Sequence, residues 1–136
     1  MKDKLANFKN KTVLKKVSII SKLKGLNQRL GLIKEINDVK YYIVSSANSP
    51  SQTITILNSF NQKVILICGG YDKQAPFDML GEVLIKKVKH LILMGQTASL
   101  IEMSVLKKLT GKYRGIELRI TRCHTMQQAV DCAYLS

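Results

Sequence analysis

The stretch Ile65–Leu80, ILICGGYDKQAPFDML, decides the fold class that the sequence predicts. Its first residues belong to a short β-branched run, Val64 to Cys68, of the kind that is buried in a parallel sheet. Two glycines follow that run directly, and a helical pattern then extends from Phe77 to Lys87. A strand, a glycine turn and a helix in this order predict one βα unit of a parallel sheet.

The same alternation of strands and helices extends through the rest of the chain. Ser49 and Pro50 offer an N-cap and a first helical residue for a helix that continues through Phe60. Further strands are predicted at residues 90–94 and 116–120, and further helices at residues 98–109 and 125–135. Right-handed crossovers then give an α/β fold, a Rossmann-like, mostly parallel sheet with helices on both faces.

An N-terminal hairpin is predicted before this sheet. The strand-like stretches Arg29 to Ile36 and Val39 to Ser45 are separated by Asn37-Asp38, a pair that forms tight turns. Residues 1–24 hold eight lysines and one acid, and they predict a basic N-terminal tail and an amphipathic helix. That helix either packs on the domain, which is favoured because its apolar stripe is short, or binds an anionic surface. The α/β domain occupies residues 25–136.

Composition favours one soluble domain with anionic partners. The chain has 136 residues, of which 46% are hydrophobic, and a formal net charge of +13, which attracts nucleotides, nucleic acid or membrane head groups. No apolar run approaches the roughly 20 residues that cross a bilayer. The three cysteines include no CxxC pair, which predicts reduced thiols and a cytoplasmic location.

No catalytic residue and no metal site is predicted. His90 and His124 are the only histidines, and they lie far apart in the sequence. Cys123 is adjacent to His124, but a nucleophile and its base would also need a third group that orients the base. A buried thiol beside a helix cap is the more common arrangement.

The glycine turn is the candidate binding site. In a parallel sheet, ligands bind beyond the carboxyl ends of the strands, where Gly69 and Gly70 are expected. Glycines permit positive φ and close backbone approach, Lys73 can hold a phosphate or a carboxylate, and Asp72 can orient that lysine or accept a ligand hydroxyl. The spacings of the P-loop and of the dinucleotide fingerprint are absent. By itself the motif is a weak signal, and a simple strand-to-helix turn with an exposed lysine is the preferred interpretation.

Four segments together resemble the C-terminal domain of the Mur ligases. They are GLNQRLGLIKEINDVKYY, SSANSP, VILICGGYDKQAPFDML and VKHLILMGQTASLI, and they cover the chain from about Ile20 to its end. The family signatures run approximately Leu-Pro-His-Arg-Leu-Glu, Asn-Asp-Ser-Lys-Ala-Thr-Asn-Pro and Gly-Gly-x-Asp-Lys. Within the family, the likeness is greatest to the members that add D-glutamate to UDP-N-acetylmuramoyl-L-alanine.

The resemblance implies roles for individual residues. Arg29 matches the arginine that meets the ATP phosphates, and Lys73 matches the lysine that binds the carboxylate of the incoming amino acid. Arginine suits the first task through its planar fork, and lysine suits the second as a compact charge. The implied nucleotide-binding residues are Arg29 and Ser46, and the implied substrate-binding residues are Asn48, Gly69, Gly70, Asp72 and Lys73.

The second signature departs from the family pattern. The residues at positions 44–50, VSSANSP, keep Ser45, Ala47 and Pro50, but they place Val44 at the acidic position and Ser46 at the lysine. Asn48 and Ser49 replace a threonine and an asparagine, and in the first signature Gln28 replaces a histidine and Gly31 a glutamate. These changes remove groups that the family places near the nucleotide.

The resemblance implies an amino-acid-binding domain of a D-glutamate-adding ligase of peptidoglycan synthesis, with D-glutamate as its ligand. ATP and Mg²⁺ would require the family's central domain, which this chain lacks, as it lacks the domain that holds the UDP-sugar. The chain also ends before the family's Ser-Pro-Ala segment, so we expect no ligation by the isolated chain, since the rate of such a reaction depends on positioning.

Two alternatives remain open from the sequence. A catalytically dead remnant would use its basic surface to bind nucleic acid or a membrane, although no nucleic-acid-reading motif occurs and aromatic residues are few. In the other alternative, this chain is a structural partner that docks on a separately encoded ligase core, and that core contains the family's missing domains.

Overall fold

The computed structural model describes residues 31–44, 49–71 and 74–136. The chain divides into two compact units, residues 1–48 and residues 49–136, and each is described by itself. The described part of the first unit is a hairpin, and the second unit holds a sheet and its helices. The predicted basic tail and helix at residues 1–24 lie outside the described residues.

The hairpin in the first unit consists of β1 (Gly31–Ile36) and β2 (Val39–Ile43), which pair in antiparallel fashion. Ile36 pairs with Val39, so Asn37 and Asp38 alone form the turn, with φ of 48° and 63°. Positive φ at both turn positions matches the twist of the flanking strands, and Asn and Asp tolerate that conformation. The predicted hairpin is therefore confirmed.

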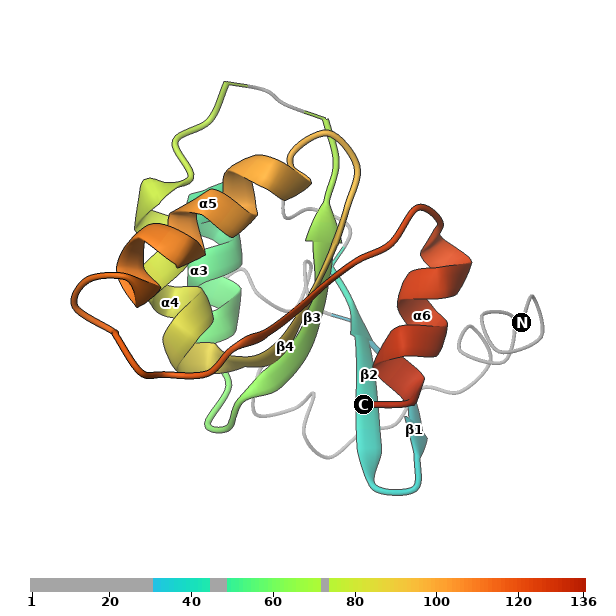
Figure 1. Ribbon diagram of the computed structural model, residues 1–136. Helices are drawn as coiled ribbons and strands as arrows, with labels where there is room; N and C mark the ends of the chain where they lie inside the picture. The colour runs from blue at the N-terminus through green and yellow to red at the C-terminus, as the bar shows by residue number, and fades with distance from the viewer. Residues whose placement is uncertain (1–30, 45–48, 72–73) are drawn as a thin grey trace. The chain divides into compact units, whose positions relative to one another are not determined.

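The second unit alternates helices and strands, as the sequence predicts. Its elements are α3 (Pro50–Asn58), β3 (Val64–Gly69), α4 (Asp78–Lys87), β4 (Val88–Met94), α5 (Ala98–Leu109), β5 (Arg119–Arg122) and α6 (Met126–Tyr134). The strands form one parallel sheet in the order β3-β4-β5. Figure 1 shows α3, α4 and α5 on one side of this sheet and α6 on the other. The predicted α/β fold class is confirmed.

The start of α3 follows the prediction in detail. Ser49 is the N-cap residue in an extended conformation, and its hydroxyl accepts a hydrogen bond from the backbone N–H of Gln52 at 3.4 Å. Pro50 follows at the first helical position, where its missing N–H is not needed, and it is buried. The capping hydroxyl satisfies one of the donors that a helix start leaves without a partner.

The central strand β4 is buried on both faces. Leu91 and Leu93 point into the core cluster that α4 and α5 cover, with Leu84 and Val105 among its fully buried members. Side chains alternate along a strand, so His90 and Ile92 lie on the opposite face, beneath α6. A strand that is covered on both faces explains the continuous apolar run at residues 91–94.

The last strand lies further along the chain than predicted. The sequence predicts it at residues 116–120, whereas β5 spans Arg119–Arg122 and pairs only with β4. The turn after α5 continues as far as Ile116, because the hydroxyl of Tyr113 donates to Glu82 in α4 at 2.5 Å and Gly115 takes a φ of 86°. The first apolar residue of the predicted strand, Ile116, therefore belongs to this turn and not to β5.

Candidate functional site

The carboxyl edge of the sheet gathers the ends of all three parallel strands. β3 ends at Gly69, β4 at Met94 and β5 at Arg122. The loops that follow β3 and β4 lead into α4 and α5, and the backbone of Cys123 donates to Leu93 O at 2.9 Å beside them. In open α/β sheets this edge is where ligands bind.

Gly69 is required by the packing of β3 against β4. Its φ is 143°, and a Cβ added there would lie 1.7 Å from the carbonyl oxygen of Met94. No real side chain fits at that distance. The absence of a side chain at Gly69 therefore lets the two strand ends approach each other, which is a structural reason for this glycine apart from any ligand.

Gly70 is required for a different reason. Its φ is 140°, which L-amino acids rarely adopt, but a Cβ there would meet no heavy atom within 4 Å in the described structure. Its carbonyl oxygen accepts a hydrogen bond from Thr97 N at 3.1 Å, and a Cβ on Gly95 would lie 2.9 Å from Gly70 N. The loops after β3 and β4 thus contact each other closely, while the side-chain position of Gly70 opens onto free space.

The predicted site residues divide into two groups. Gly69 and Gly70 lie at the carboxyl edge of the sheet, where the sequence places them. The other five, whose roles rest on the family resemblance, lie outside the described residues: Arg29, Ser46, Asn48, Asp72 and Lys73. The described geometry therefore gives the location of the two glycines, and the binding roles of all seven residues stay predictions.

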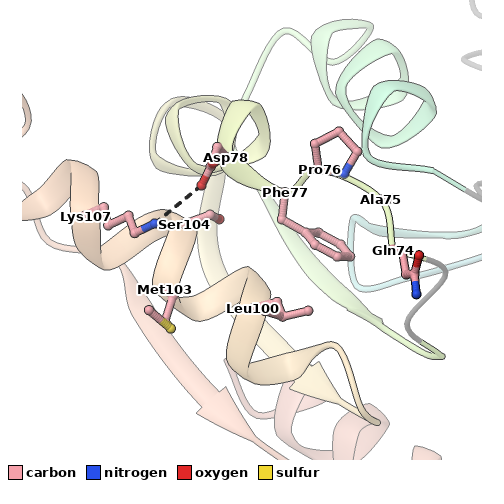
Figure 2. A pocket seen from close by; sticks show the side chains of 9 residues that line it. All are labelled: Gln74, Ala75, Pro76, Phe77, Asp78, Leu100, Met103, Ser104 and Lys107. Carbon is pink, nitrogen blue, oxygen red and sulfur yellow. Dashed lines mark ion pairs between the residues drawn. The ribbon is translucent and has the colours of Figure 1, made fainter.

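A shallow pocket of about 310 Å³ lies between the loop that leads into α4 and one side of α5. Phe77 comes from the loop, and Leu100 and Met103 come from α5, as Figure 2 shows. Lys107 Nζ lies 3.6 Å from the carboxylate of Asp78 beside it, and both side chains are largely exposed. Such an exposed pair contributes little to stability.

Arg122, the last residue of β5, was not among the candidate residues that the sequence indicated. Its guanidinium donates from both Nε and Nη2 to Glu102 Oε2, and from Nη1 to Ser99 Oγ at 3.1 Å. Ser99 and Glu102 belong to the first two turns of α5. A cation is thus fixed beside the start of α5, and the position of Arg122 at a strand end was the signal that could have indicated it.

His90 is buried, and both of its ring nitrogens have partners. Nδ1 lies 2.6 Å from Ser136 Oγ, and Nε2 lies 2.8 Å from Thr121 Oγ1. Because the Ser136 hydroxyl donates its proton to Cys132 O, the ring donates from Nδ1 and accepts at Nε2. Burial, with the nearby charge of Arg119, lowers the pKa of His90.

We expect acid to destabilise the fold through His90. In the unfolded chain His90 takes up a proton near pH 6.5, whereas in the folded chain its lowered pKa opposes protonation. The contribution of neutral His90 to the free energy of unfolding is therefore fully present above pH 6.5 and is lost as the pH falls below it. Thermal unfolding between pH 8 and pH 5 should show a falling midpoint. His90→Gln should flatten that decline and His124→Gln should not, and an equal decline in both variants would contradict the assignment.

Cys68 and Cys123 do not have the properties of activated nucleophiles. Burial raises the pKa of Cys68 to about 12, and burial together with Cys132 raises the pKa of Cys123. A nucleophilic cysteine needs a lowered pKa that yields the thiolate.

Two features are absent from the described ranges. No cluster of three or more His, Cys, Asp or Glu side chains that could hold a metal ion occurs within residues 31–44, 49–71 and 74–136. Among the helices of those ranges, none is long and apolar enough to span a membrane.

A parallel sheet with a glycine turn at its carboxyl edge defines an α/β domain of the open-sheet class, in which ligands commonly bind at that edge. The chain belongs to the Mur ligase family, because the family profile described as "Mur ligase, glutamate ligase domain" matches residues 28–135. This match confirms the resemblance that the sequence motifs indicate.

Curated relatives agree with the family assignment. The chain is 44% identical over 125 residues to a UDP-N-acetylmuramoylalanine–D-glutamate ligase from Acetivibrio thermocellus, covering 92% of the chain and 26% of the relative. It is 42% identical over 116 residues to the ligase of the same name from Ruminiclostridium cellulolyticum, covering 85% of the chain and 25% of the relative. The chain thus spans about a quarter of the length of these relatives. They give no support to the alternative of a basic binding module.

Proposed function

We propose that this chain is the amino-acid-binding domain of a UDP-N-acetylmuramoylalanine–D-glutamate ligase of peptidoglycan synthesis. The observation that carries the proposal is the similarity to ligases of that name over 92% of the chain. The glycine turn supports it, because Gly70 lies at the carboxyl edge of the sheet and no atom of the described residues lies within 4 Å of its side-chain position. Within this proposal, the domain acts only together with the rest of the ligase.

In the proposed reaction, ATP phosphorylates the carboxylate of the UDP-sugar peptide and leaves as ADP. The amine of D-glutamate then attacks the acyl phosphate, which forms the amide bond and releases inorganic phosphate. The contribution of this domain is to hold and orient D-glutamate. Lys73 would bind a carboxylate of the amino acid, while Asp72 would orient that lysine. Holding the amine in position turns an encounter between two molecules into a step within one complex. This positioning contributes a large part of the rate enhancement in such reactions.

ATP and Mg²⁺ would be held mainly by the central domain of the complete ligase. Within the described ranges, no group of three or more His, Cys, Asp or Glu side chains could hold a metal ion. Arg29 and Ser46 remain the residues of this chain proposed to meet the nucleotide. We propose a cytoplasmic location, where ATP and UDP-linked precursors are available.

The first test is a calorimetric titration of the purified chain with D-glutamate, at two salt concentrations. Saturable binding is expected, and Lys73→Ala should weaken it by at least tenfold, because a hydrogen bond to a charged group contributes about 1.5–3 kcal/mol. Lys63→Ala is the matched control, since it removes the same charge from an exposed residue just before β3.

Two results would overturn the proposal. One is the absence of D-glutamate binding by a chain that is folded by circular dichroism. The other is an equal loss of affinity in Lys73→Ala and Lys63→Ala, since that would reflect general attraction to a basic protein rather than a site. L-Glutamate should bind more weakly than D-glutamate if the site holds its ligand for reaction.

A further inference from the structure

The start of α5 leaves backbone donors open at the carboxyl edge of the sheet. Ala98 N donates to Gly95 O and Ile101 N donates to Thr97 O, but no backbone acceptor among the described residues receives the N–H of Ser99 or Leu100. α5 is a helix of 12 residues, so its N-terminus carries a partial positive charge. Open N–H groups and this charge together favour an anion.

Thr97 is the N-cap residue of α5, but it does not cap the helix. Ser49 and Thr125 cap α3 and α6 from an extended backbone conformation, whereas Thr97 has φ of −82° and ψ of −5° and makes no capping bond. Its side chain is 3% exposed, and within the described part of the chain no partner is found for its hydroxyl. A buried hydroxyl without a partner is unfavourable, so a ligand oxygen at this helix end would satisfy it.

Arg122 adds a fixed cation next to the same helix end. Nη1 donates to the hydroxyl of Ser99 at 3.1 Å, which leaves the proton of that hydroxyl free to point to a ligand. The Arg122 side chain is half exposed, and its guanidinium has five N–H donors, of which three are used by Ser99 and Glu102. The carboxylate of Glu102 reduces the attraction of an anion to Arg122, because it partly neutralises the charge of the guanidinium.

We infer that the N-terminus of α5, with Thr97, Ser99 and Arg122, is a binding subsite for an oxyanion, either a carboxylate or a phosphate. It adjoins the glycine turn through the hydrogen bond from Thr97 N to Gly70 O. The source of the oxyanion rests on the proposed function, which supplies two, the side-chain carboxylate of D-glutamate and a phosphate group. The subsite itself rests only on the donors at this helix end.

The test follows backbone amide resonances of the ¹⁵N-labelled chain during separate titrations with inorganic phosphate, D-glutamate and D-alanine. Saturable shifts are expected at the amides of Ser99 and Leu100. Arg122→Gln should lower the affinity for the anion that produces these shifts about tenfold, because it removes a charge-assisted donor. Glu102→Gln should raise that affinity, because it removes a competing carboxylate. Thr97→Val keeps the side-chain shape and should also weaken binding, and the spectrum itself reports whether each variant is folded.

The outcomes separate this subsite from the amino-acid site. Shifts with D-glutamate but not with D-alanine would show that the subsite binds the side-chain carboxylate of D-glutamate. Shifts with phosphate alone would show that it binds a phosphate group. Lys63→Gln is the matched charge control, so an equal loss in Lys63→Gln and Arg122→Gln would overturn the inference. Unmoved Ser99 and Leu100 amides in all titrations would also overturn it, even if D-glutamate binds through Lys73. A phosphate response without D-glutamate binding would leave the subsite intact and remove the proposed function.

Discussion

Gly69→Ala is expected to remove most of the stability of the domain. The added Cβ would lie 1.7 Å from Met94 O and 2.7 Å from Met94 C, so the end of β3 must separate from β4. The positive φ of 143° adds backbone strain. We expect a loss of more than about 4 kcal/mol, in the range reserved for severe core or backbone defects. For a domain near the lower end of the ordinary range of stability, about 5 kcal/mol, little stability would then remain.

Gly70→Ala is the matched control for this prediction. It has nearly the same φ, 140°, but its Cβ meets nothing within 4 Å among the described atoms. It should therefore show only the strain of an L-residue in this region, about 1–3 kcal/mol. Urea unfolding of both variants, followed by circular dichroism, measures the difference. Equal losses in the two variants would show that φ, rather than the contact with β4, determines the effect.

The sequence predicted the alternation of the elements because local signals agreed with the tertiary fold. Ser49 and Pro50 marked the start of α3, and Asn37-Asp38 marked the hairpin turn. The position of β5 was wrong because the contact between Tyr113 and Glu82, 31 residues apart, fixes the preceding turn. A single sequence carries no local signal for such a distant contact.

The candidate site was predicted only in part for a similar reason. Gly69 and Gly70 follow a recognisable strand, so their place at the carboxyl edge could be derived from the sequence. The different roles of the two glycines could not, because they depend on how closely Met94 approaches one of them. Arg122 and Thr97 were missed, since an arginine at a strand end and a threonine before a helix are individually common.

Gly81→Ala is the second substitution with a large expected effect. In an isolated helix, alanine is more stable than glycine by roughly 1 kcal/mol, so helix propensity alone predicts a gain. In this fold, however, the added Cβ in α4 would lie 2.1 Å from the carbonyl oxygen of Ser104 and 2.6 Å from its carbonyl carbon in α5. Backbone atoms cannot rotate away as a side chain does, so α4 and α5 must move apart.

The separation of α4 from α5 would loosen the core that lies between the helices and the sheet. Leu84 lies one turn from Gly81, Val105 lies next to Ser104, and both are fully buried. Their packing would therefore be lost together with the close contact between the helices. Loss of packing at buried leucines and valines costs about 2–5 kcal/mol, which outweighs the gain in helix propensity. Met79→Ala, at a 56% exposed position of α4, should change stability by less than about 0.5 kcal/mol and serves as the control. A thermal midpoint for Gly81→Ala at or above that of the unchanged chain would mean that α5 can shift without loss of the core.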